Sequence, residues 1–380
     1  MVRNRNPFVV NKYIENRLFC RRDEEKSQLI KQIDNGRNVV LISPRRIGKT
    51  SLIYHIFNDE TFNAVYHPVY VDIYSTTSVT EFVFQFGKEV FSSLKGSVGL
   101  KKKFAHLLKS LSLGIEYNPI SGEPSLDLQL NQIVNPLQTL DEIFEYLEEC
   151  DKPCVVCIDE FQQIGEYKDK TLEATLRGYI QRCRKTGFIF AGSHRHMMLN
   201  MFNSSARPFY NSAVTMEIRP FAKKVYVDFA ESQFKAQGKG IEREVIEAVY
   251  DMFEAKTWHM QLAMNELYSI TEDGEKCDMS FLEVAIENIL MIQYPVYAEI
   301  MANLSQIQKA VLASIARETA SVDGAKAMSS EFVNKYRLQS ASSVQGAMKS
   351  LITSDLVSVR TEGGWRIADP LFAMWLRKNY

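Results

Sequence analysis

The sequence predicts an α/β domain with a parallel sheet sandwiched by helices, followed by an all-α segment and a winged-helix domain. Three observations in this chain of 380 residues support that prediction. Short apolar runs alternate with helical segments over residues 1–217. A glycine-containing turn joins the first apolar run to a helix. Finally, residues 305–380 have the pattern of three short helices and a hairpin.

Five short, almost continuously apolar runs form the expected sheet. Apolar strands separated by helices are typical of a parallel sheet that is covered on both faces. Right-handed crossovers then give a doubly wound domain, which we place at residues 1–220. The five runs are Asn38–Ser43, Val65–Tyr74, Cys154–Glu160, Phe188–Ser193 and Val214–Ile218.

One segment of this domain interrupts the alternation of strands and helices. Apolar and polar residues alternate on both sides of a turn within Leu111–Leu130, which predicts an inserted β-hairpin at about residues 111–130. The helical stretch before it carries Lys101, Lys102 and Lys103. These lysines form either a solvated helix face or a contact for anions.

The rest of the chain divides into an all-α domain at residues 221–302 and a winged-helix domain at residues 303–380. The second has three helices followed by two strands around a turn, and its residues 305–380 hold ten Lys or Arg against six Asp or Glu. This small basic excess leaves DNA binding and protein docking both open. For DNA, the groove helix would be Ser340–Lys349, with Ser342, Ser343, Gln345 and Lys349 facing outward and Arg360 and Arg366 near the wing.

Composition excludes several classes of protein. The net charge of -1 gives no global attraction for nucleic acid or an anionic membrane. We find no apolar run of about 18 residues and no signal peptide, so we expect a cytoplasmic protein without membrane contact. Cys150, Cys154 and Cys157 could be read as metal ligands. However, Cys154 and Cys157 would face opposite sides of a strand, which favours buried thiols.

The turn after the first strand carries the chemistry. Its sequence SPRRIGKT fits the phosphate-binding pattern G-x-x-x-x-G-K-[ST], except for Ser43 at the first position. The N-terminus of the following helix offers unpaired N–H groups to phosphate, and Gly48 lets the backbone approach it. Lys49 would reach the β and γ oxygens, and Thr50 would offer its hydroxyl to Mg²⁺. The expected nucleotide-binding residues are Ser43, Pro44, Arg45, Arg46, Ile47, Gly48, Lys49, Thr50 and Ser51.

A second motif ends the apolar run CVVCIDE. We expect Asp159 to hold Mg²⁺, usually through water, and Glu160 to orient and polarise the attacking water. The two motifs together predict nucleotide binding on a P-loop NTPase fold. No Asn-Lys-x-Asp follows an apolar strand, which argues against a GTPase, and a small-molecule kinase would usually lack the Asp-Glu strand end.

Hydrolysis also needs a group that senses the γ-phosphate and an arginine. Ser193, at the end of a predicted strand, is either that sensor or a simple cap. Arg207 precedes the last strand and is either an arginine finger that acts on another subunit or a member of a surface salt bridge. Arg45 and Arg46 could contact the γ-phosphate, a lid or a partner.

The chain resembles prokaryotic AAA+ ATPases close to the STAND signalling ATPases. PRRxGKTSL and IDEF are the most specific parts of a likeness that covers most of the chain. The resemblance rests on Asn6–Phe8, Phe19–Glu25, Ser43–Leu52, Cys157–Ile164, Leu176–Gln181, Ala191–Ser193, Thr257–Leu267 and Trp365–Leu376.

The resemblance implies ATP as the nucleotide, with the helical segment as a lid and the residues around Phe8 and Phe19–Arg22 closing over the adenine. Two positions depart from the pattern. The usual F-x-G-R lacks its glycine at Arg21, and the arginine expected after Tyr210 is replaced by Asn211.

We therefore expect an ATP-binding, Mg²⁺-dependent ATPase that works as a nucleotide-driven switch. Two alternatives remain, an ATP-regulated DNA-binding protein and a scaffold that binds ATP without turnover. A protein client and a homo-oligomer are both left open as partners. Relatives often assemble so that one subunit completes the site of another.

Overall fold

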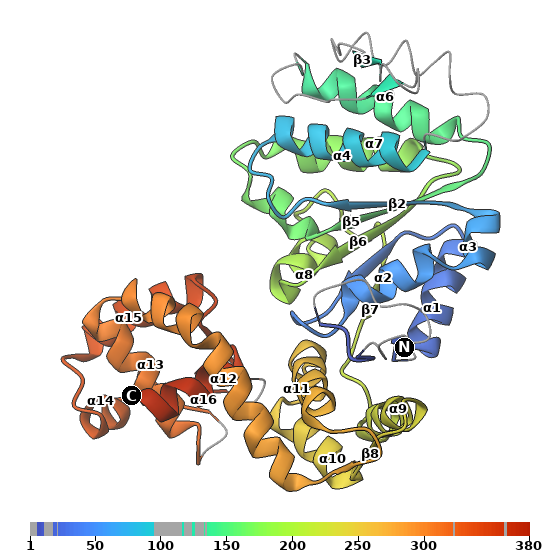
Figure 1. The fold of residues 1–380 in the computed structure, drawn as a ribbon. Coiled ribbons are helices and arrows are strands. Elements are labelled where there is room, and N and C mark those ends of the chain that lie inside the picture. Colours follow the sequence, from blue (N-terminus) through green and yellow to red (C-terminus); the bar gives the residue numbers. More distant parts are fainter. Residues whose placement is uncertain are drawn as a thin grey trace. The chain divides into compact units, whose positions relative to one another are not determined.

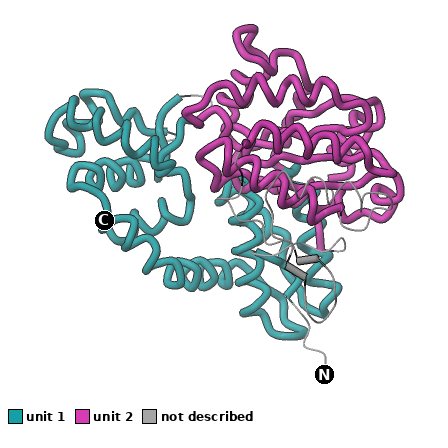
Figure 2. The backbone as a smooth tube through the Cα atoms, turned by 90° about the horizontal axis from the view of Figure 1, so that it is seen from above, with its two compact units in different colours: residues 1–10, 221–380 teal, residues 11–220 magenta. Residues whose placement is uncertain are grey.

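The computed structural model describes residues 6–10, 18–20, 22–94, 116–117, 124–125, 133, 135–321, 324–360 and 363–380. The chain forms two compact units (Figure 2). We call residues 11–220 the core unit, and residues 1–10 together with 221–380 the helical unit. Residues 1–10 thus group with the helical unit, whereas the sequence suggested a first domain of residues 1–220. The predicted lysine cluster at residues 101–103 lies outside the described residues.

The core unit contains a parallel sheet of five strands in the order β2-β5-β6-β1-β7 (Figure 1). Each strand lies within one of the five apolar runs or differs from it by one residue, so the predicted parallel α/β sheet is confirmed. The strands are β1 (Val39–Ile42), β2 (His67–Asp72), β5 (Cys154–Asp159), β6 (Gly187–Gly192) and β7 (Val214–Glu217).

Alternate strand residues enter two separate hydrophobic cores. Val40 packs in one core and Val39 in the other, because successive side chains of a strand point to opposite faces. Cys154 and Cys157 also lie in different cores and are buried, as their offset of three predicted. No group of three or more His, Cys, Asp or Glu side chains suited to a metal occurs among the described residues.

Helices cover both faces of the sheet (Figure 1). One face is covered by α4, α6 and α7, and the other by α1 and α2. The helices of this unit are α1 (Asp23–Asp34), α2 (Lys49–Phe57), α3 (Glu60–Val65), α4 (Val79–Leu94), α6 (Pro136–Glu148), α7 (Thr171–Arg182) and α8 (Arg195–Asn203), with the 3-10 helix η3 (Phe161–Glu166).

Within the predicted hairpin insertion, the structure describes four residues. The strands β3 (Glu116–Tyr117) and β4 (Pro124–Ser125) pair antiparallel, with Glu116 opposite Ser125. The other residues of the expected hairpin lie outside the described part of the chain.

The helical unit begins with four helices and a short strand pair. We expected no strands here, but β8 (Gly240–Ile241) and β9 (Lys276–Cys277) pair in parallel, so the prediction of an all-α segment was wrong. Each of these strands has only two residues, which is too few to show an alternation of apolar and polar residues in the sequence. The helices are α9 (Lys223–Ala236), α10 (Arg243–Met252), α11 (Thr257–Ile270) and α12 (Met279–Ala302).

The end of the chain has the predicted order of three helices and a two-stranded wing. Each of the three helices begins with a serine side chain that accepts a backbone N–H, which explains where they start. A further helix follows the wing, and an isolated bridge joins Ala325 to Trp365. The elements are α13 (Gln306–Glu318), α14 (Ser330–Lys335), α15 (Ala341–Thr353), β10 (Val357–Val359), β11 (Trp365–Ile367) and α16 (Pro370–Asn379).

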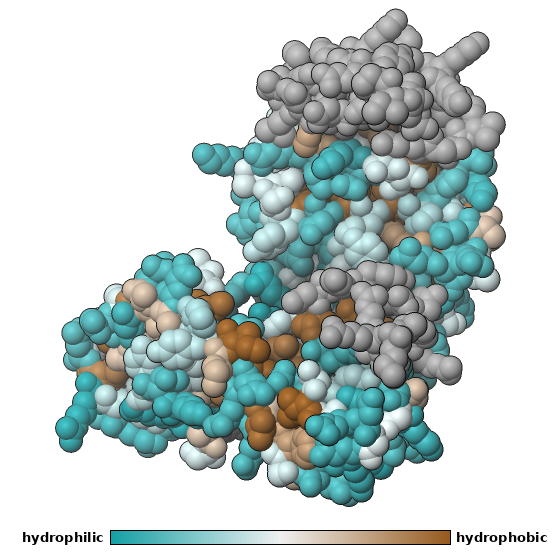
Figure 3. Space-filling model, in the orientation of Figure 1, coloured by the Kyte–Doolittle hydropathy of each residue, from teal (hydrophilic) through white to brown (hydrophobic). Residues whose placement is uncertain are grey.

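Hydrophilic residues cover most of the visible face of both units, and hydrophobic residues gather on part of the helical unit (Figure 3). In the helical unit, exposed apolar side chains gather on α12, including Met291, Ile292 and Val296. None of the helices in the described part of the chain combines the length and apolar character that a membrane span needs.

Candidate functional site

The SPRRIGKT loop lies between β1 and α2, at the carboxyl end of the sheet. Gly48 is the residue before α2 and has a φ of 96°, a conformation that favours glycine. No side chain caps the helix, so backbone N–H groups of its first turn remain available for an anion. The hydroxyl of Ser43 is buried and has no hydrogen-bond partner among the described residues.

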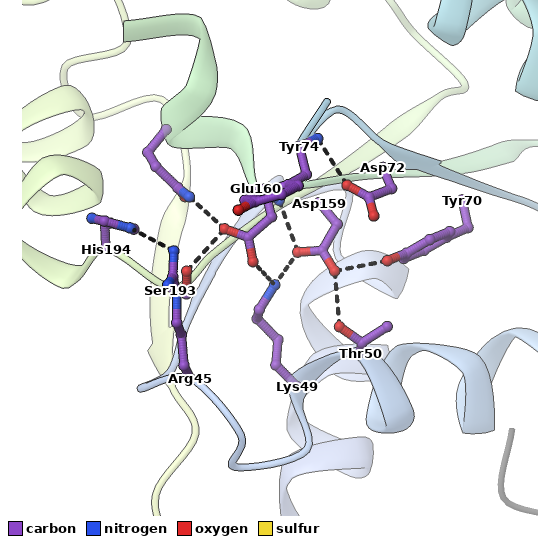
Figure 4. Close-up of polar contacts among 11 residues, drawn as sticks. Arg45, Lys49, Thr50, Tyr70, Asp72, Tyr74, Asp159, Glu160, Ser193 and His194 are labelled. Atoms are coloured by element: carbon purple, nitrogen blue, oxygen red, sulfur yellow. Dashed lines mark hydrogen bonds and ion pairs between the residues drawn. The ribbon is translucent and has the colours of Figure 1, made fainter. Parts of the chain in front are cut away.

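Five side chains meet beside this loop (Figure 4). Lys49 forms an ion pair with Asp159, and its Nζ lies 3.8 Å from Glu160 Oε1. Thr50 Oγ1 donates a hydrogen bond of 2.9 Å to Asp159 Oδ2, and Tyr70 donates one of 2.8 Å to the same oxygen. The two predicted motifs therefore come together at one carboxylate.

The surroundings of Asp159 keep it ionised. Burial raises the pKa of this carboxyl, but the charge of Lys49 and the hydrogen bonds from Lys49 and Tyr70 hold the pKa below its usual value. Burial and the charge of Asp159 raise the pKa of Tyr70, so its hydroxyl keeps the proton that it donates. Sequence reasoning missed Tyr70, although it lies two residues before the end of β2.

Asp72 is a second acidic group that the sequence analysis missed. It ends β2 directly opposite Asp159 in the parallel register. Burial, together with the charges of Asp159 and Glu160, raises the pKa of Asp72. Asp72, Asp159 and Glu160 thus place their negative charges at one edge of the sheet near Lys49, although the three are not arranged as a metal-binding group.

Glu160 is held by two neighbours (Figure 4). Its backbone is left-handed, with a φ of 56°, and its Oε2 accepts hydrogen bonds from Ser193 Oγ at 2.9 Å and from Gln162 Nε2. The structure therefore brings Ser193 to Glu160, at the end of the neighbouring strand β6. Gln162 gave no sequence signal, because its role depends on the turn that follows β5.

The structure does not bring Arg207 into this cluster. Its guanidinium binds the carboxylate of Glu173 on α7, with N–O distances of 2.5 and 3.2 Å. Burial raises the pKa of Glu173, and the positive charge of Arg207 and its hydrogen bonds partly offset this increase. This geometry matches the salt bridge that the sequence left as the alternative to an arginine finger. Arg45, by contrast, lies at the site, 3.1 Å from the Nε2 atom of His194.

Arg22 supports the loop from behind. Its guanidinium is almost fully buried and donates hydrogen bonds to the carbonyls of Ile47 and Arg219, each 2.9 Å long, and to Glu25 at 2.7 Å. It thus connects the loop before Gly48 to the end of the core unit. Arg22 belongs to the N-terminal motif noted in the sequence, but that motif did not predict its support of the phosphate loop.

The aromatic residues expected over an adenine are placed differently. Phe8 is fully buried in the helical unit, where its ring packs against Phe229, Phe234 and Tyr268. Phe19 is also buried and stacks on His55, with ring centroids 4.4 Å apart. Both rings pack in hydrophobic cores, and the adenine contact stays a prediction. Arg21 lies outside the described residues.

Two family models match the chain. One, an ATPase domain predominantly from Archaea, matches residues 19–262. The other, "Probable winged helix domain", matches residues 295–378. No curated protein matches the sequence.

Several solved structures resemble the whole chain. A Walker-type ATPase of Pyrococcus abyssi is 17% identical, with 98% of this chain and 99% of that chain covered and a TM-score of 0.62. The ORC2 protein of Aeropyrum pernix, in ADPNP-ADP complexes, is 14% identical, with 99% and 97% covered and a TM-score of 0.57. The ORC1 protein of the same organism, in complex with DNA, is 13% identical, with 94% and 92% covered and a TM-score of 0.52. These likenesses, together with the sheet and the winged-helix match, show a P-loop NTPase fold with a C-terminal winged-helix domain.

Proposed function

Because the chain belongs to the family of ATPase domains found predominantly in Archaea, we propose that it binds ATP with Mg²⁺ at the SPRRIGKT loop and hydrolyses it. One observation carries the proposal. Thr50 Oγ1 and Asp159 Oδ2 are 2.9 Å apart, close enough to share one cation. The ADPNP-ADP complexes of the ORC2 protein support nucleotide binding by this fold.

The residues present fit both ligands. A hydroxyl and a carboxylate are the hard oxygen donors that Mg²⁺ prefers, and Thr50 and Asp159 supply them. Lys49 would exchange its carboxylate partners for β and γ oxygens, supported by the backbone N–H groups of Gly48–Ser51 at the start of α2. When bound, Mg²⁺ neutralises charge that develops on the phosphates.

Three other residues take the remaining roles. Glu160 would accept a proton from the attacking water and orient it, and Ser193 would report the γ-phosphate to Glu160 through their hydrogen bond. Arg207 would reach a γ-phosphate only after leaving Glu173, and then in a neighbouring subunit. Turnover is therefore slow in the monomer.

Nucleotide state would change how the core unit is oriented to a lid at residues 221–302 and a winged-helix domain at residues 303–380. The resemblance to STAND ATPases supports such a switch. Arg22 gives it a physical route, because this one side chain binds both the phosphate loop and the carbonyl of Arg219, two residues before the helical unit begins.

A Mg²⁺-dependent ATPase assay on the full chain tests the proposal. Lys49→Ala should abolish hydrolysis, and Glu160→Gln should lower kcat by about 10²–10⁴-fold while ATP stays bound. Glu166→Gln is the matched control, because Glu166 is exposed at the end of η3. Hydrolysis by Glu160→Gln at the wild-type rate would disprove the role of Glu160. ATP bound without phosphate release in a single-turnover assay would instead favour a scaffold.

A second candidate function is ATP-regulated DNA binding. Ser342, Gln345 and Lys349 are exposed on α15, as the groove-helix prediction requires, and the ORC1 protein was solved with DNA. Duplex binding by the full chain should weaken steeply with salt, and Lys349→Ala should weaken it and lower the salt slope by about one. Binding that is absent or insensitive to salt would remove this candidate.

A further inference from the structure

The two oxygens of the Glu160 carboxylate have different surroundings (Figure 4). Oε2 accepts hydrogen bonds from Ser193 Oγ at 2.9 Å and from Gln162 Nε2. Oε1 lies 3.8 Å from Nζ of Lys49, the group expected to reach the β and γ phosphates. One oxygen is thus anchored by two donors, while the other lies near the lysine of the phosphate loop.

The backbone around Glu160 explains how Gln162 reaches the anchored oxygen. The N–H of Glu160 donates a hydrogen bond of 2.8 Å to Asp159 Oδ1, and its carbonyl accepts one of 2.9 Å from the N–H of Gln163. The φ of 56° at Glu160 is a left-handed conformation, which costs free energy in a residue other than glycine. This strained turn leads into η3 and brings the side chain of Gln162 back to Glu160.

Packing alone does not explain the amide of Gln162. The side chain is buried, yet its Oε1 has no hydrogen-bond partner among the described residues. A buried amide oxygen without a donor costs free energy, which an apolar side chain of similar size would avoid. The contribution that such a side chain could not make is the hydrogen bond from Nε2 to Glu160.

The end of β6 leaves room for this amide. A Cβ atom on Gly192 would lie 2.5 Å from Gln162 Oε1 and 2.6 Å from the Sδ atom of Met198, closer than real Cβ atoms come. Both side chains are buried, so neither has free space beside it into which it could move. The glycine before Ser193 therefore permits the position of Gln162, and Ser193 itself supplies the second donor to Glu160.

We propose that Gln162 is a positioning residue for ATP hydrolysis, which together with Ser193 fixes Oε2 of Glu160 and leaves Oε1 to orient the attacking water. This inference rests on the proposed ATPase function. As the water attacks, its oxygen bonds to the γ-phosphorus, the bond from that phosphorus to ADP breaks, and a water proton passes to Oε1. Without Gln162 only Ser193 holds the carboxylate, so Oε1 is less often in place.

Steady-state ATPase kinetics of the full chain test the proposal. Gln162→Met keeps the length of the side chain but removes the donor, so kcat should fall by about 10- to 100-fold while KM for ATP changes less than about twofold. Gln163→Met is the matched control, because Gln163 is the half-buried neighbour in η3, and it should keep the wild-type kcat. In single-turnover assays, adding Gln162→Met to Glu160→Gln should cost no further activity, because Gln162 acts only through Glu160.

A structural measurement separates failure of this inference from failure of the ATPase proposal. Crystal structures of the wild type and of Gln162→Met show where the Glu160 carboxylate lies, whether or not ATP is hydrolysed. We expect one Glu160 conformer, bonded to Ser193 and Gln162, in the wild type and more than one in the variant. A wild type without ATPase activity would remove the proposed function, whereas an unchanged Glu160 conformer in the variant would overturn the positioning role. Equal kcat values for Gln162→Met and Gln163→Met would overturn it as well.

Discussion

The phosphate-loop site of the core unit and the cluster of Glu254, Arg360 and Arg366 in the helical unit both gather charged side chains, but they differ in burial. At the loop, Lys49 and Asp159 are almost fully buried and paired with each other. In the second cluster, Glu254 pairs with both arginines, and all three side chains are partly exposed. Removing one partner from the buried loop pair would leave an uncompensated buried charge and cost much stability. Removing one partner from the exposed cluster would cost little, because water solvates the remaining charges.

Loss of a buried cation gives the sharpest contrast. Arg22→Gln should destabilise the core unit by about 3–5 kcal/mol, because it leaves the carbonyls of Ile47 and Arg219 and the carboxylate of Glu25 without their shared donor. It should also raise KM for ATP, because the loop at Ile47 is no longer held. Urea unfolding followed by a probe in the core unit measures the first effect.

Arg243→Gln is the exposed counterpart. Arg243 also binds two carboxylates, Asp228 and Glu231, but all three side chains are largely accessible to water. We expect this variant to unfold at nearly the wild-type urea concentration. If it costs as much as Arg22→Gln, burial is not what separates the two regions.

Two neighbouring carboxylates of the core unit should respond to pH with opposite signs. Asp159 has a lowered pKa, so its ionisation stabilises the fold above its ordinary pKa, and this contribution is lost as the pH falls through the folded value. Asp159→Asn should therefore cost about 1–3 kcal/mol at pH 7 and less near pH 3. Asp72 has a raised pKa, so its ionised form is disfavoured in the folded state.

Asp72→Asn should accordingly stabilise the core unit slightly at pH 7, by less than about 1 kcal/mol, because water still reaches the Asp72 side chain and screens the repulsion. This gain should vanish in acid, where Asp72 is protonated in both the folded and the unfolded state. Urea unfolding midpoints measured at several pH values between about 3 and about 7 check both variants. Destabilisation by Asp72→Asn at pH 7 would contradict the assigned repulsion.

The sheet and the centre of the site could be predicted because local patterns encode them. Apolar runs marked all five strands, and two motifs brought Lys49 and Thr50 to Asp159. Those motifs work because the carboxyl ends of parallel strands meet at one edge, where the loop before α2 also lies. Ser193 was found for the same reason, as the residue that follows β6.

Contacts between distant residues without a motif could not be predicted. Arg207 pairs with Glu173 and Arg366 with Glu254, and neither pair has a characteristic spacing in the sequence. Phe8 matched an adenine-binding motif, yet its burial depends on rings that lie far along the chain. Such outcomes depend on tertiary packing, which one sequence does not reveal.

The last prediction concerns Tyr70 and tests whether Asp159 needs both of its hydroxyl donors. Tyr70→Phe removes the bond of 2.8 Å to Asp159 Oδ2 but leaves that of Thr50, so we expect a loss of about 0.5–1.5 kcal/mol. Without Tyr70 the carboxylate is less firmly placed, so the Mg²⁺ concentration for half-maximal hydrolysis should rise several-fold while kcat changes little. Tyr179→Phe is the control, since that hydroxyl donates to the Leu137 carbonyl at an exposed position. An unchanged Mg²⁺ dependence would mean that Thr50 alone positions Asp159.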